Sequence, residues 1–194
     1  MLAGMKRIAL LVLLSSGTAA FAAPVLREGQ SFNEAYEAGK TALRLHNASL
    51  LTVGYVFKVY VAGLYLADDS DTSRVLDDVP KRLEIAYLRD VTKKIIVDAS
   101  EDHFRKNLKP AQIAALRDRL DAINKLYSDV KEGDRYALTY FPGAGCELAL
   151  NGKPLGTIPG ADFASAYFGI WLGQGCAKPE LRDALLGKAG AQKN

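Results

Sequence analysis

One stretch constrains the fold more than any other: the run from Lys58 to Asp68, with Val53 to Phe57 directly in front of it. It is rich in β-branched and aromatic residues, and apolar residues occupy both its odd and its even positions. Such a run is typical of a long strand that is covered on both faces. Lys58 and Tyr60 are the only clearly polar residues of the even side. We therefore expect a central strand with core on one face and a pocket beside Tyr60 on the other.

The first residues predict export. Lys6 and Arg7 precede a short apolar stretch, Ile8 to Leu14, and small residues follow around Ala22. This order is that of a cleaved secretory signal over residues 1–22, and it predicts a periplasmic protein. A retained membrane anchor is the alternative, but the apolar stretch is shorter than the about 20 residues of a membrane span. The domain is then expected over residues 23–187, with a loose tail over 188–194.

The charge balance excludes one class of partner. Removing Lys6 and Arg7 from the 25 basic and 22 acidic residues leaves a net charge of +1. Nucleic-acid binding requires a concentrated basic face, and the sequence shows none. No later segment is apolar enough for a stable membrane span.

Cys146 and Cys176 are the only cysteines. Because an exported protein meets oxidising conditions, a disulfide between them is the simplest expectation. Two buried free thiols or a metal-binding pair are the alternatives. No metal site is predicted, since His46 and His103, the only histidines, have no ligand spacing to either cysteine.

The hydrophobic periodicity predicts an α+β domain with a mostly antiparallel sheet. Asn47 to Ser49 is expected to turn or kink the chain before the long strand, and Asn151-Gly152 is a hairpin signal. A short helix is expected from Thr72 or Ser73 to about Val79. The other expected strands are Thr41–Leu45, Lys81–Tyr87, Arg135–Phe141, Cys146–Leu150 and Lys153–Ile158, and the other helices are Thr92–Leu108 and those beginning at Pro110, Ala161 and Pro179.

Standard catalytic constellations are not apparent in the sequence. It has no recognisable context for a Ser-His-Asp triad and no glycine-rich phosphate loop, so no cofactor is predicted. His103 is a candidate acid or base, or a packed residue on an amphipathic helix. These features alone predict an exported α+β domain with an apolar pocket.

Six segments follow one another along the chain: KVYVAGLYL (58–66), YFPG (140–143), LNGK (150–153), IPGADF (158–163), IWLG (170–173) and LLG (185–187). In this order they resemble the bacterial chalcone isomerase-like proteins over about Thr41 to Gly187. The resemblance implies an open-faced β-sandwich, in which a large antiparallel sheet carries a layer of helices over one face and a ligand cleft lies between them.

The resemblance also implies site residues on the strands. In fatty-acid-binding relatives, a tyrosine on the long strand and an arginine on the preceding strand bind a carboxylate, and Tyr60 matches that tyrosine. Thr52 stands at the position of the arginine and shares parity with Tyr60, which predicts that Thr52 faces the cleft. A neutral hydroxyl cannot replace a bidentate cation. Arg44 is the nearest substitute, or else an exposed strand arginine.

On the helices, the tyrosine and asparagine that act in plant chalcone isomerases fall on Ile96 and His103. A small hydroxyl residue of the late helix falls near Ala164. Without these donors the developing enolate loses stabilisation, where one donor contributes about 3 kcal/mol. The resemblance therefore predicts a cleft without chalcone isomerase activity.

Three functions follow as hypotheses. The first is a non-catalytic exported protein that binds a small apolar or amphipathic, fatty-acid-like ligand with Tyr60, Thr52 and His103 near it. The second is an isomerase that uses His103 and Tyr60 as acid and base. The third is an interaction module for another envelope protein, which would carry a large apolar patch outside the cleft.

Overall fold

The structure is a computed structural model, and it describes residues 25–38, 41–54, 56–67 and 70–188. The predicted signal, residues 1–22, lies outside the described residues, as do Asp68 at the end of the run from Lys58 and residues 189–194 of the predicted tail. In the described part of the chain, no helix is long and apolar enough to cross a membrane.

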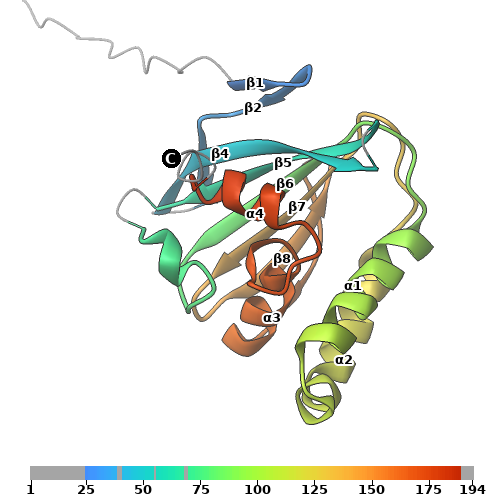
Figure 1. Cartoon of the computed structure of the whole chain (residues 1–194). Coiled ribbons are helices and arrows are strands. Elements are labelled where there is room, and N and C mark those ends of the chain that lie inside the picture. The colour runs from blue at the N-terminus through green and yellow to red at the C-terminus, as the bar shows by residue number, and fades with distance from the viewer. Residues whose placement is uncertain (1–24, 39–40, 55, 68–69, 189–194) are drawn as a thin grey trace, which may run out of the picture.

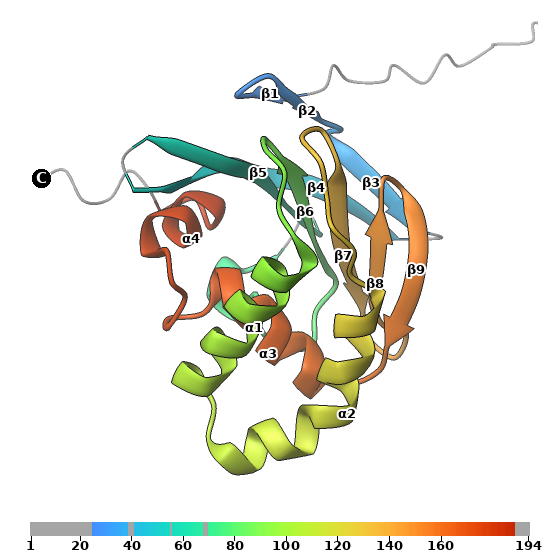
Figure 2. The same ribbon diagram turned by 90° about the vertical axis from the view of Figure 1, so that its right-hand side faces the viewer.

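The centre of the molecule is a curled, seven-stranded antiparallel sheet in which neighbours in space follow the order of the chain. Figures 1 and 2 show how the sheet curls around its helices. Each strand pairs with the next in sequence, which confirms the predicted α+β fold with an open-faced sandwich. The strands are β3 (Ala35–Ala38), β4 (Thr41–Val53), β5 (Phe57–Leu66), β6 (Lys81–Tyr87), β7 (Arg135–Phe141), β8 (Gly145–Leu150) and β9 (Lys153–Ile158).

Four helices lie on the concave side of the sheet (Figure 2). They are α1 (Lys93–Asn107), α2 (Pro110–Leu126), α3 (Ala161–Leu172) and α4 (Pro179–Leu185). Thr92 caps α1 by accepting a hydrogen bond from the backbone N–H of Ile95 at 3.4 Å, and Pro110 and Pro179 open α2 and α4, as proline does in first turns. The helix predicted over Thr72 to Val79 is wrong in length, because only the 3-10 turn Thr72–Arg74 forms there.

The hydrophobic core is divided by the sheet. The larger cluster lies on the helix side and joins even residues of β5, such as Leu64, to aromatic residues of α3, such as Tyr167 and Phe168. The smaller cluster lies on the outer side around Val61, Tyr65 and Phe32. Both faces of β5 are therefore covered, as its uninterrupted apolar sequence predicts.

An N-terminal hairpin of β1 (Val25–Arg27) and β2 (Gln30–Phe32) covers part of the outer face (Figure 1). Phe32 is fully buried, and a Cβ placed on Gly63 would lie 2.7 Å from its ring. Only glycine at position 63 therefore lets the hairpin lie this close to β5.

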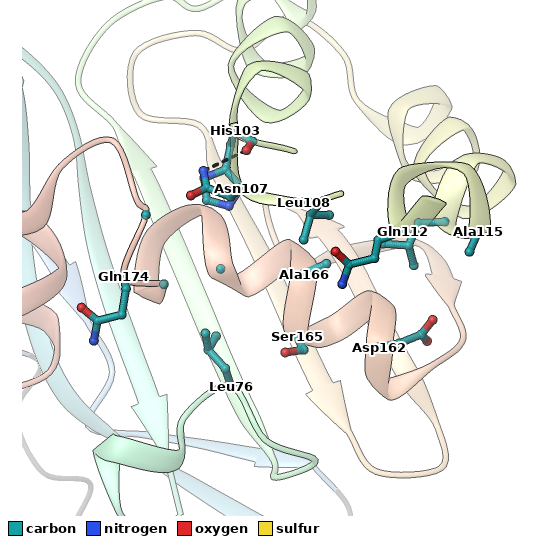
Figure 3. A pocket seen from close by; sticks show the side chains of 14 residues that line it. Leu76, His103, Asn107, Leu108, Gln112, Ala115, Asp162, Ser165, Ala166 and Gln174 are labelled. Atoms are coloured by element: carbon teal, nitrogen blue, oxygen red, sulfur yellow. Dashed lines mark hydrogen bonds between the residues drawn. The ribbon is translucent and has the colours of Figure 1, made fainter. Parts of the chain in front are cut away.

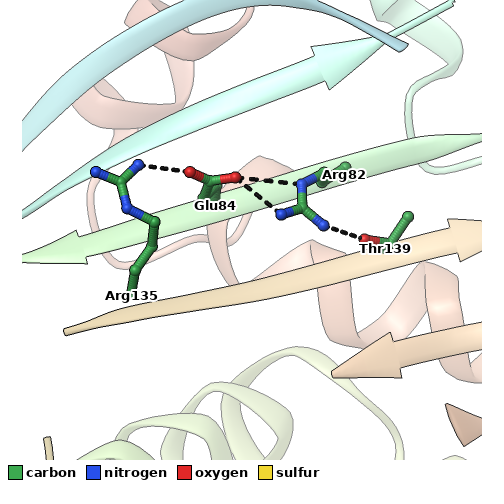
Figure 4. Close-up of polar contacts among 4 residues, drawn as sticks. All are labelled: Arg82, Glu84, Arg135 and Thr139. Atoms are coloured by element: carbon green, nitrogen blue, oxygen red, sulfur yellow. Dashed lines mark hydrogen bonds and ion pairs between the residues drawn. The ribbon is translucent and has the colours of Figure 1, made fainter. Parts of the chain in front are cut away.

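Beside the hairpin, a network of charged side chains lies on the outer face (Figure 4). The carboxylate of Glu84 accepts hydrogen bonds from Arg82 Nη2 at 2.9 Å and from Arg135 Nη1 at 2.5 Å. Arg82 also donates to Thr139 Oγ1 at 2.7 Å. Because Arg82 and Glu84 are nearly buried, at 9% and 13% side-chain exposure, this face is closed by paired charges.

Two irregularities in β4 and β5 correct the predicted strand boundaries. β4 runs from Thr41 to Val53, so the chain does not turn at Asn47 to Ser49, where a turn or kink was expected; only a pairing irregularity at His46 borders that segment. The pairing of β4 with β5 shifts at His46 and again at Val59, and each shift leaves one extra residue in one strand. Such bulges reverse the inward and outward alternation locally, and simple parity in the sequence cannot detect them.

Candidate functional site

An apolar cavity of about 290 Å³ lies between the sheet and the helices. We call it the cleft. Its floor comes from β4, β5 and β6, and its walls come from α1, α3 and the start of α4. Leu51, Val59, Tyr60 and Tyr87 contribute from the sheet, and Ile96, His103 and Trp171 from the helices.

The bulge at Val59 shapes the floor of the cleft. Tyr60 pairs with Leu51 on one side and with Tyr87 on the other, so these three side chains share one face. Since Val59 is the extra residue, it lines the cleft together with Tyr60 instead of pointing away. Two consecutive residues of β5 therefore contribute to one wall.

Tyr60 is held by a tryptophan from the helical layer. Trp171 Nε1 on α3 donates a hydrogen bond to Tyr60 Oη at 3.0 Å. Burial raises the pKa of Tyr60, although the Trp171 donor acts in the opposite direction. The hydroxyl therefore stays protonated at neutral pH, and no described residue accepts a hydrogen bond from it. Tyr60 can offer that proton to a ligand.

His103 separates the cleft from a second cavity. The side-chain nitrogen of Asn107 lies 3.3 Å from His103 Nδ1, and because an amide nitrogen only donates, Nδ1 accepts and the ring proton is on Nε2. Burial lowers the pKa of His103 despite the opposing charge of Asp102, so the ring is neutral at pH 7. His103 can therefore donate from Nε2.

The second cavity, of about 530 Å³, is a groove between α1, α2 and α3 (Figure 3). Asn107, Gln112, Ser165 and Gln174 line it, while Asp162 is held by Arg119 through two hydrogen bonds of 2.7 and 2.6 Å. His103 lines this groove and the cleft. The described residues contain no group of three or more His, Cys, Asp or Glu that could hold a metal.

The structure brings together half of the predicted cleft residues. Tyr60, Ile96 and His103 line one cavity. Thr52 does not, because the bulge pairs it with Lys58, and the parity that predicted otherwise is wrong. It borders a neighbouring hollow instead.

The other two predicted residues also lie outside the cleft lining. Ala164 is 1% exposed within the core of α3. Arg44 is exposed and pairs with Leu66, at the end of β4 farthest from Leu51.

The cleft residues that were not predicted from the sequence include Tyr87, Trp171 and Lys178. Tyr87 lies at the end of an alternating strand, on the side of Leu83 and Ile85, and this alternation was the signal for it. Trp171 lies on a helix that is apolar nearly all round, so periodicity could not give its direction. Lys178, in the linker before α4, had no signal in the sequence.

Exposed apolar side chains gather where the cleft opens. Val53, Val56 and Phe57, at the β4–β5 turn, are 49%, 74% and 58% exposed, and Ile95 at the start of α1 is 59% exposed. Val53 and Ile95 also line the cleft. These side chains thus extend the apolar surface of the cleft to its mouth.

The predicted disulfide is not present: Cys146 and Cys176 are both buried free thiols. Cys146 lies on β8, and Cys176 lies in the segment between α3 and α4.

Comparison with known proteins supports the fold. The family model of the chalcone isomerase-like proteins matches residues 26–187. A crystal structure of a fatty-acid binding protein from Arabidopsis thaliana superposes with a TM-score of 0.65 at 14% identity, covering 86% of this chain and 97% of that one. No curated protein matches the sequence. At this identity the structural match supports the fold alone.

Proposed function

Because the chain belongs to the chalcone isomerase-like family, we propose that it is a non-catalytic binding protein that holds a small amphipathic ligand, with its fatty-acid-like chain in the cleft. The observation that carries this proposal is the cleft itself. Protein interiors are close-packed, and a cavity of about 290 Å³ with an apolar lining is typical of a binding site. The structural relative is a fatty-acid binding protein, which points to the same ligand class.

The polar groups of the cleft suit binding more than catalysis. The neutral hydroxyl of Tyr60 and the Nε2–H of neutral His103 are both donors, so they can orient a ligand oxygen. Apolar side chains from β4, β6 and α1 supply the rest of the contact. Transfer of a hydrocarbon chain into such surroundings is favourable by about 0.8 kcal/mol per buried methylene.

Filling the cleft tests this proposal. Ala99 lines the cleft from α1, and Ala99→Phe places a ring into it. Ala114, on α2, is also exposed but lines none of the three cavities described, so Ala114→Phe is the matched control. We expect a fatty-acid thermal shift and lipid recovered by extraction and mass spectrometry for the parent and the control, and neither for Ala99→Phe. Absence of bound lipid and of any shift in the parent would refute the proposal.

The second candidate is an isomerase, because Tyr60 and His103 line the same cleft. Burial disfavours ionised Tyr60, and His103 carries its proton on Nε2, so both would act first as acids. Turnover of a substrate that is abolished in the Tyr60→Phe, His103→Ala double variant would favour this candidate over simple binding.

Export completes the proposal. The order of charged, apolar and small residues over 1–22 supports removal of a signal and delivery to the periplasm. N-terminal sequencing of the protein from a periplasmic fraction should begin near residue 23. An uncleaved chain in the membrane fraction would contradict it.

A further inference from the structure

We propose that a polar hollow beside the cleft binds the head group of a zwitterionic, single-chain amphiphile, with an anionic group at Lys178 and a cationic group at Glu180. This inference rests on the proposed function and names the class of its ligand. The hollow, which we call the side chamber, has a volume of about 480 Å³ and lies between the end of β4 and α4.

The side chamber is continuous with the cleft. Leu51, Lys178 and Leu181 line both cavities. A ligand with its chain in the cleft therefore has room for a bulky polar group next door. With a volume of about 480 Å³, the side chamber has room for a head group larger than a simple carboxylate.

Lys178 stands at the junction. Of the described residues that line the cleft, Lys178 is the only one with a charged side chain, since His103 is neutral. Its side chain forms no ion pair or hydrogen bond with any described residue. A cation without a partner, next to an apolar cavity, attracts the anionic group of a ligand whose chain lies in that cavity.

Glu180 supplies the opposite charge farther from the cleft. It lines the side chamber but not the cleft, and its side chain also lacks an ion pair with the described residues. The two charges therefore follow one another outward from the cleft, first positive and then negative. A phosphoethanolamine head has the complementary order, with the phosphate nearer the chain and the ammonium group beyond it.

The edge of β4 adds polar groups to the side chamber. Beyond Leu45, no described strand pairs with β4 on the side away from β5, and Leu50, Thr52 and Gly54 border the chamber. An unpaired strand edge presents backbone N–H and C=O groups. These groups can hydrogen-bond to a head group without further side chains.

Titration calorimetry of the full chain with three lauroyl amphiphiles tests the assignment: lysophosphatidylethanolamine, lysophosphatidylglycerol and monolauroylglycerol. We expect the first to bind most tightly and the uncharged one least. Lys178→Gln should lower the affinity for both lysophospholipids about tenfold. Glu180→Gln should lower the affinity for lysophosphatidylethanolamine only. Glu180→Lys should reverse the preference, so that lysophosphatidylglycerol binds more tightly. Lys153→Gln, an exposed position on β9, is the matched control and should change nothing.

The outcomes separate this inference from the proposed function. Equal affinity for all three amphiphiles, unaffected by the variants, would overturn the head-group assignment and leave the acyl cleft intact. A response to Lys178→Gln without one to Glu180→Gln would overturn the zwitterionic class. If the parent protein binds none of the three amphiphiles and also shows no thermal shift with free fatty acids, the proposed function is refuted as well.

Discussion

The two faces of the sheet handle polar groups in opposite ways. On the outer face, Arg82 and Arg135 both form ion pairs with Glu84 (Figure 4). On the helix side, Tyr60 and His103 leave hydrogen-bond donors facing a cavity. One face uses polar groups to close the structure, and the other keeps them available. This difference predicts the larger stability effects on the outer face and, under the proposed function, ligand binding on the helix side.

The largest loss of stability is expected from a substitution on the outer face. Glu84→Gln leaves the guanidinium groups of Arg82 and Arg135 largely buried without an anion. Breaking such a network costs about 3–5 kcal/mol, measurable as a lower urea midpoint. Asp98→Asn is the control, because its partner Lys94 is exposed, and it should cost less than about 0.5 kcal/mol. Equal effects of the two variants would contradict the contrast between the faces.

A smaller loss of stability is expected from Tyr60→Phe on the helix side. The variant removes the acceptor of the Trp171 N–H, and an unsatisfied donor costs about 1–2 kcal/mol. Unlike Glu84→Gln, it should also weaken ligand binding. Titration with a fatty acid under conditions where both variants are folded would show this difference. Weaker binding by Glu84→Gln alone would invert the comparison.

Lys81 is the helix side's own buried charge. Its Nζ donates to the carbonyl oxygens of Asp77 and Val79 at 2.7 and 3.0 Å, and burial lowers its pKa to about 8. In the unfolded chain its pKa returns to the usual 10.5, so above pH 8 the unfolded state binds more protons than the folded state. Stability should therefore rise with pH through this window, by about 1 kcal/mol between pH 8 and 9.

Urea unfolding at pH 7.5 and 9 measures this rise. Lys81→Met should remove it while keeping the packing against Tyr140 and Phe168. The raised pKa of Cys146, about 12, acts in the other direction only above the usual thiol pKa near 9, and it is common to both proteins. A variant that keeps the full rise would show that another group titrates.

Treatment with a reductant is expected to leave the stability of the protein unchanged. Since Cys146 and Cys176 are free, dithiothreitol should leave the unfolding midpoint unchanged, and two thiols should be alkylated in denaturant without a reductant. In the folded protein Cys146 should react slowly, because its raised pKa leaves little thiolate. An unfolding midpoint that falls on reduction would instead support a disulfide between the two cysteines.

Sequence reasoning reached the fold because each element carried its own signal. The alternation of Lys81 to Tyr87 and the Asn151-Gly152 turn predict their strands and hairpin as found. It reached the site only in part. Tyr60 and His103 follow from the resemblance, but the positions of Thr52 and Val59 depend on a bulge that no residue pattern marks. Lys178 depends on how α4 docks along β4, which is decided by tertiary packing.

The bulge at Val59 also divides β5 into two parts that differ in pairing. From Tyr60 onward the strand lies between β4 and β6, and its alternation is regular. Before the bulge, Phe57 and Lys58 pair only with β4. Because the register between β5 and β6 begins at Tyr60, substitutions at Phe57 and Lys58 should leave that register unchanged.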